Sequence, residues 1–88
     1  MNTELTTDTR ELLAALRDLL NVPEPADRGD RPKRNLQLQI NLARVVGTLN
    51  ALVSVDHPNV AVAVRMLRED LAEPLDYATQ DETAGGAR

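Results

Sequence analysis

The residues that could carry nucleophilic or acid–base chemistry are few and lie close together in the chain. There is one histidine, His57, one serine, Ser54, and no cysteine. A serine nucleophile needs a histidine base beside it and hydrogen-bond donors for the oxyanion, and no motif near Ser54 and His57 supplies such donors. With only Asp56 beside it, His57 also lacks the ligand count of a zinc site. We expect Ser54 to end one helix and His57 to cap the next.

A second group of candidate ligands is the acidic run Glu69, Asp70, Glu73 and Asp76. Its spacing differs from that of an EF-hand loop, and a solvated acidic helix end is the simpler interpretation. Of the four glycines, two are isolated and two lie together near the C-terminus, so no phosphate-binding loop is present. The sequence therefore predicts no catalytic residue, no metal site, no cofactor and a protein that is not an enzyme.

Length and composition predict one small domain at 1–80, followed by a disordered tail at 81–88. The apolar residues are almost all Leu, Val and Ala, with one Tyr and no Phe or Trp. Because small aliphatic cores often gain burial by self-association, we expect a homo-oligomer, most simply a dimer. No apolar run approaches the ~20 residues that span a bilayer. We expect a cytoplasmic protein with no membrane contact, and the nine arginines against one lysine suggest a GC-rich bacterial genome.

The net charge of −4 is unevenly distributed along this small acidic chain. Residues 1–27 carry two basic and six acidic side chains, a net charge of −4, and residues 69–88 carry one basic and six acidic, a net charge of −5. The middle segment, 28–68, carries seven basic and two acidic side chains, a net charge of +5. We expect the three segments to neutralise one another in the fold, although the middle one could also attract a polyanion.

The first helix is predicted over 9–20. Its leucines fall at the spacing of an amphipathic helix, namely Leu12, Leu13, Leu16, Leu19 and Leu20. Asp8 is the expected N-cap, with Glu11 completing a capping box, and Asn21 suits the C-terminal end.

A proline-rich and charged segment, 22–34, follows the first helix. Its three prolines and one glycine argue against a core-facing element, so we expect a mobile basic loop. Four cations gather in it and are candidate contacts for an anion or nucleic acid: Arg28, Arg31, Lys33 and Arg34. A solvated loop, partly neutralised by its own aspartates, is the favoured interpretation.

The stretch "KRNLQLQINLARVV", residues 33–46, can be read in two ways. Apolar and polar residues alternate over 36–41, as in a half-buried strand. A longer window favours a helix over 36–54, because apolar residues recur at steps of four and three from Leu38 through Leu42 and Val45 to Leu52. Asn35 is the expected N-cap of this helix. A third helix is predicted over 57–73, with His57 as N-cap and Pro74 beyond its end.

A strand at 36–41 would give the chain a different function. Residues 33–73 would then resemble a ribbon-helix-helix domain, in which two strands pair across a dimer in the major groove. The resemblance implies a dimeric DNA-binding transcriptional regulator, with base contacts from Gln37, Gln39 and Asn41. Glutamine and asparagine suit adenine edges, and the +5 segment would contact phosphates.

The favoured interpretation is an all-α, three-helix bundle with a broadly apolar middle helix. We expect a core made of the following residues: Leu12, Leu16, Leu19, Leu38, Leu42, Val45, Leu49, Leu52, Val60, Val64, Leu67 and Leu71. The expected role is that of a non-catalytic interaction, adaptor or regulatory protein, acting through self-association or a helical protein partner. The candidate interface residues are Leu36, Ile40, Val46 and Val53.

Overall fold

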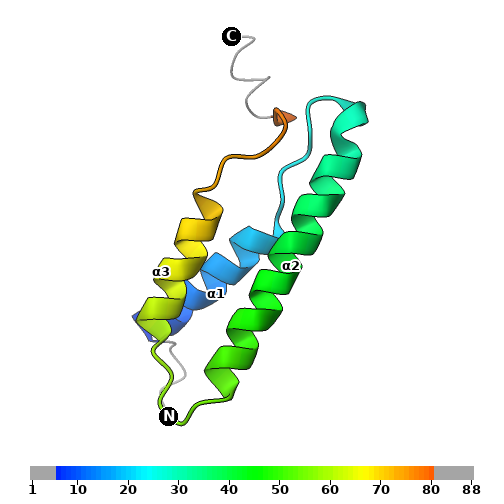
Figure 1. The fold of residues 1–88 in the computed structure, drawn as a ribbon. Coiled ribbons are helices and arrows are strands. Elements are labelled where there is room, and N and C mark those ends of the chain that lie inside the picture. Colours follow the sequence, from blue (N-terminus) through cyan, green and yellow to red (C-terminus); the bar gives the residue numbers. More distant parts are fainter. Residues whose placement is uncertain (1–5, 81–88) are drawn as a thin grey trace.

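The computed structural model describes residues 6–80, and these form three α-helices and one short 3-10 helix. The helices are α1 (Thr7–Leu20), η1 (Arg28–Asp30), α2 (Arg31–Val53) and α3 (Val60–Leu71). In Figure 1, α2 and α3 run side by side in opposite directions and α1 crosses obliquely behind them. The predicted all-α, three-helix fold is confirmed. The predicted disordered tail at 81–88 lies outside the described residues.

Helix α1 begins two residues earlier than the sequence predicts. Its N-cap is Thr6, whose side-chain oxygen accepts a hydrogen bond from the Thr9 backbone N–H at 3.1 Å. Asp8 lies inside the first turn, where its negative charge favours the helix N-terminus. The predicted cap at Asp8 is therefore wrong. The C-cap at Asn21 is confirmed, with its N–H donating to the carbonyl oxygen of Arg17.

Helix α2 contains the ambiguous stretch and is helical throughout it, so the alternative of a strand at 36–41 is wrong. The helix begins at Arg31, five residues before the predicted start, and Asn35 lies within it. Pro32 allows this early start because a proline in the first turn lacks only an N–H that would have no partner in the helix. The predicted basic loop at 22–34 is therefore wrong for residues 28–34, which lie in η1 and the start of α2, and its mobility stays a prediction. Asp27 caps η1 by accepting from the Gly29 N–H at 2.9 Å, and α2 follows directly.

Helix α3 begins later than predicted, at Val60. Its N-cap is Asn59, whose side chain accepts from the Val62 N–H at 3.1 Å, so the cap predicted at His57 is wrong. Pro58 belongs to the preceding turn. The helix ends at Leu71 with Ala72 as C-cap, in keeping with the expected stop before Pro74.

The core is small and lies where α1 meets the other two helices. Its buried apolar members are Ala15, Leu16, Leu19, Val22, Val45 and Leu67, with Leu12 and Leu71 packed against them. Two predicted core residues are instead exposed, Leu42 at 50% and Leu49 at 41%. The apolar stripe of α2 that includes these residues was expected to face the core along its whole length, but α1 contacts α2 along only part of that stripe. The remaining apolar surface of α2 stays outside the core.

Two non-helical segments lie side by side at the far end of the fold. The Ala26 N–H donates to the Ala78 carbonyl at 2.9 Å, and the Gln80 N–H donates to the Glu24 carbonyl at 3.1 Å. The Tyr77 hydroxyl donates to the Pro23 carbonyl at 2.8 Å. Partial burial raises the pKa of the Tyr77 phenol above its ordinary value. These contacts hold the chain after α3 against the α1–α2 connection.

Candidate interaction surface on helix α2

Helix α2 presents an almost uncharged surface to solvent. Between positions 35 and 54 the only ionisable residue is Arg44. Six of its large apolar side chains are substantially exposed: Leu36 at 57%, Ile40 at 39%, Leu42 at 50%, Val46 at 48%, Leu49 at 41% and Val53 at 79%. Isolated exposed apolar residues are ordinary on a folded domain, but six on one helix are a concentration of exposed apolar surface of the kind that marks an interaction site.

The exposed residues fall on two sides of the helix. At 100° per residue, Leu42, Val46, Leu49 and Val53 form one stripe, which we name the outer stripe. Leu36 and Ile40, four apart, point away from it and form a pair that we name the knob pair. Eleven and fifteen residues beyond Leu36, Gly47 and Ala51 lie on the same side of α2 as the knob pair.

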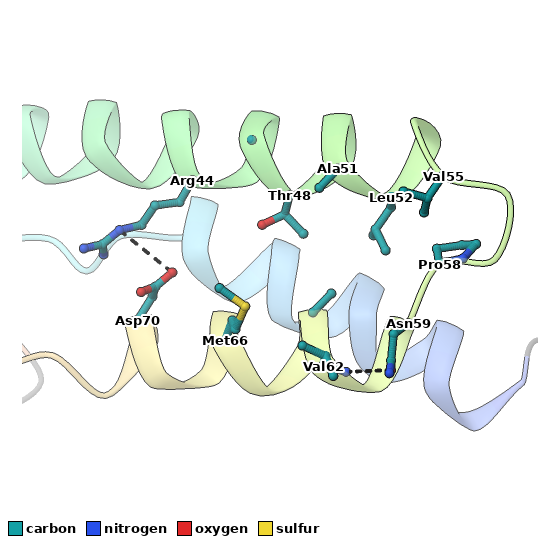
Figure 2. Close-up of a pocket in the computed structure, with 12 residues that line it drawn as sticks. Arg44, Thr48, Ala51, Leu52, Val55, Pro58, Asn59, Val62, Met66 and Asp70 are labelled. Carbon is teal, nitrogen blue, oxygen red and sulfur yellow. Dashed lines mark hydrogen bonds and ion pairs between the residues drawn. The ribbon is translucent and has the colours of Figure 1, made fainter.

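The side of α2 with Gly47 and Ala51 borders a groove shared with α3. The groove encloses about 420 Å³ and is mostly apolar. Figure 2 shows Ala51 and Leu52 facing it from α2, Val62 and Met66 facing it from α3, and Val55 and Pro58 at the end where the chain turns. Val55, Val62 and Met66 are exposed at 53%, 37% and 58%. The two helices are therefore apart over this length and leave their facing apolar side chains uncovered.

The other end of the groove is marked by an ion-pair cluster. The Arg44 guanidinium lies 3.9 Å from the Asp70 carboxylate and 3.0 Å from that of Glu73, linking α2 to the end of α3. The acidic run therefore serves in part as a partner for this arginine. The one charge on the exposed stretch of α2 is thus already compensated within the chain.

The predicted interface residues Leu36, Ile40, Val46 and Val53 are all exposed on α2. Leu36 and Ile40 lie on the groove side, whereas Val46 and Val53 belong to the outer stripe. The prediction did not include the groove residues of α3. The sequence signal for this second apolar face was the spacing of Val62 and Met66. They are four residues apart and lie outside the stripe of α3 residues that faces the core.

The predicted DNA-reading residues do not share a face. Asn41 is buried and donates to the Leu19 carbonyl of α1 at 2.8 Å. Gln37 donates to the Asn41 side-chain oxygen at 2.9 Å, whereas Gln39 is exposed on the opposite side of the helix. A helix separates side chains that a strand would align. Asn41 and Gln37 therefore already make hydrogen bonds within the fold.

The predicted basic cluster is divided between local contacts and solvent. Arg34 donates to the Val22 carbonyl at 3.2 Å and lies 3.5 Å from the Glu24 carboxylate. Lys33 lies 3.7 Å from Asp30. Arg28 and Arg31 are exposed near the start of α2. The structure therefore does not bring these four cations together with the glutamines into one basic face.

The remaining candidate residues lie around the α2–α3 turn. Ser54 is the C-cap of α2, as predicted, and Asp56 and His57 are exposed in the turn. Within 6–80, no group of three or more His, Asp or Glu side chains is arranged to hold a metal ion. None of the helices in this part of the chain has the length and apolar character needed to cross a membrane.

Compared with models of protein families, with curated proteins and with solved structures, the chain matches none of them.

Proposed function

We propose that the protein is a non-catalytic interaction protein, an adaptor or regulator, which acts by self-association through the exposed apolar surface of α2. The observation that carries the proposal is the 20-residue stretch at 35–54, which has one charge, already paired, and six exposed large apolar side chains. A water-facing helix ordinarily carries charged residues on its outer face. In the second form of the proposed role, a helix of another protein binds the same surface of α2.

Burial of this surface is the physical driving force. Each square ångström of apolar surface removed from water contributes roughly 25 cal/mol, and the described part of the chain buries only six apolar side chains of its own. Association would cover apolar side chains that the small intramolecular core leaves in water. No desolvation of unpaired charge opposes it, because Arg44 is held by Asp70 and Glu73.

The proposal is tested by sedimentation equilibrium of the full chain and of two matched double variants. Ile40→Asp/Val46→Asp places a charge on each side of the α2 surface, at positions 39% and 48% exposed. Leu13→Asp/Leu20→Asp makes the same change on α1, at positions 50% and 40% exposed. We expect the wild type and the α1 variant to associate reversibly, and the α2 variant to remain at the monomer mass of 9.7 kDa with an unchanged helical circular dichroism spectrum. A wild type that stays at 9.7 kDa up to millimolar concentration would contradict self-association, as would an α2 variant that associates like the wild type.

A further inference from the structure

We infer that the groove between α2 and α3 receives the knob pair, Leu36 and Ile40, of a second copy of this chain. The two α2 helices would run antiparallel, related by a two-fold axis near Gly47. The inference rests on the proposed function, because it names the occupant and the geometry of the surface assigned there.

The groove side of α2 is self-complementary. A two-fold interface uses the same patch on both copies, so each copy must carry both the inserting and the receiving feature. Ile40 precedes Gly47 by seven residues, about 10.5 Å along the helix axis. An axis at Gly47 places Ile40 level with the end of α2 in the second copy, near Val53, and Leu36 about 6 Å further on, level with the turn that follows. The knob pair then faces Val55 and Pro58, at the end of the groove where the chain turns.

Gly47 has no evident role within a single copy. A Cβ atom added there would meet nothing within 4 Å, and its φ is not positive, so alanine would fit the isolated chain. A glycine inside a helix costs about 1 kcal/mol relative to alanine. At the proposed axis, the missing side chain allows close contact, because the distance between packed helix axes, usually about 8–10 Å, depends on the size of the side chains at the contact.

Charge selects the antiparallel direction. A parallel pair would set the basic start of α2, with Arg31 and Lys33, beside the same residues of the other copy. The antiparallel pair instead separates the two basic starts, because each of them extends past the C-terminal end of the other α2. Arg44, the one charge along the contact, is paired with Glu73 at 3.0 Å and does not need a partner from the second copy.

A dimer of this kind needs an interface of standard size. Such an interface buries roughly 800 Å² per partner, about one eighth of the 6605 Å² surface of the chain. The part of α2 from Leu36 to its end at Val53 is about 25 Å long. The exposed apolar side chains of the knob pair and the groove are between 37% and 58% exposed in one copy: Leu36, Ile40, Val55, Val62 and Met66. The two-fold axis repeats each knob-and-groove contact, so the same residues are covered in both copies.

Because the chain has no cysteine, introduced cysteines can report the register. Ala43 and Ala51 are both exposed and lie four residues on either side of Gly47. In the proposed pair, position 43 of one copy faces position 51 of the other. Two copies of position 51 lie about 12 Å apart along the axis, beyond the roughly 7 Å between Cα atoms that a disulfide spans.

The experiment oxidises Ala43→Cys and Ala51→Cys separately and as a mixture, in the otherwise full chain. We expect a disulfide-linked dimer only from the mixture. A linked dimer from Ala51→Cys alone would show a parallel pair and overturn the inference, while the proposed self-association would stand. Failure of the mixture to link, with the wild type dimeric, would also overturn it by showing that another surface, such as the outer stripe, forms the contact.

A second variant tests the crossing point. Gly47→Leu should fold, since the space around Gly47 is open in one copy and leucine favours helix. At the crossing point its side chain overpacks the contact by about 1–3 kcal/mol, a roughly 5-fold to 150-fold rise in the dimer dissociation constant. Val46→Leu, which introduces a leucine one residue away on the outer stripe, is the control and should dimerise like the wild type. Equal dimerisation of Gly47→Leu and wild type would contradict an axis at Gly47.

Discussion

Asn41 shows at the scale of one residue how a polar side chain in an apolar helix fixes the fold. Its amide donates to the Leu19 carbonyl, one of the last four carbonyls of α1, which have no partner within their own helix. The amide oxygen accepts from Gln37, four residues earlier in α2. Asn41 thus joins the end of α1 to the middle of α2 from a buried position.

Replacement of Asn41 by leucine should therefore destabilise the chain although it adds apolar surface. The Leu19 carbonyl would be left buried without a donor, at a cost of about 1–3 kcal/mol in the free energy of unfolding. Urea denaturation monitored by circular dichroism measures this change. Asn50→Leu, at an exposed position of the same helix, is the control and should change stability by no more than about 0.5 kcal/mol. Equal stability of the two variants would exclude a structural role for the Asn41 amide.

Asp18 is a second residue whose hydrogen bonds predict a measurable effect on stability. It accepts from Arg68 of α3 at 2.9 Å and from Arg17 at 3.0 Å. The hydrogen bond from Arg68, followed by the one from Arg17, lowers the pKa of the Asp18 carboxyl below its ordinary value of 3.8. A carboxyl whose pKa is lower in the folded chain stabilises the fold above its unfolded pKa and loses that contribution as the pH falls through its folded pKa.

We therefore expect the wild type to lose stability relative to Asp18→Asn as the pH falls from 5 to below 3. The asparagine variant has no carboxyl at this position and should lack this part of the pH dependence. Denaturant midpoints of both proteins at several pH values provide the test. Parallel pH profiles would show that the Asp18–Arg68 pair does not contribute to folding.

Helix α2 illustrates, at the scale of an element, which features of the fold are predictable from sequence. Its existence followed from the four-three spacing around Leu38, Leu42 and Val45. The residue at which α2 begins did not follow from the sequence, because a helix could begin near Asn35 or at Arg31. The choice between them depends on the turn that Asp27 caps. The exposure of Leu42 and Leu49 was also beyond sequence, since periodicity identifies an apolar side of a helix but not how much of it another helix covers.

The two sides of α2 should respond differently to the same substitution. Val45 is 6% exposed within the core, so Val45→Asp should reduce the free energy of unfolding by more than ~3 kcal/mol, because it buries an unpaired charge. Leu49, 41% exposed, should tolerate Asp with a loss of about 1 kcal/mol or less when measured at monomeric dilution. Thermal and urea denaturation compare the two. Unfolding of Leu49→Asp under native conditions would return Leu49 to the core and contradict the arrangement of α2.

For the molecule as a whole, the charge pattern distinguishes the proposed role from a nucleic-acid-binding one. The chain is acidic overall, with a net charge of −4, and its central basic segment is partly neutralised by Asp18, Glu24, Asp30, Asp70 and Glu73. We expect it to pass through immobilised heparin and duplex DNA at physiological salt. Retention followed by release as salt increases is the signature of phosphate contacts, and it would favour the DNA-binding alternative.

The central claim is that the apolar side of α2 is covered in solution, and solvent paramagnetic relaxation of methyl groups tests it most directly. A soluble gadolinium chelate relaxes exposed methyl groups, and the chain supplies an internal control. Leu36 and Ile40 on α2 are 57% and 39% exposed, and Leu13 and Leu20 on α1 are 50% and 40% exposed. We expect the methyl groups of Leu36 and Ile40 to become protected as protein concentration rises, while those of Leu13 and Leu20 remain strongly relaxed by the chelate. Equal relaxation of both pairs at every concentration would show that α2 remains open to water and would contradict the account.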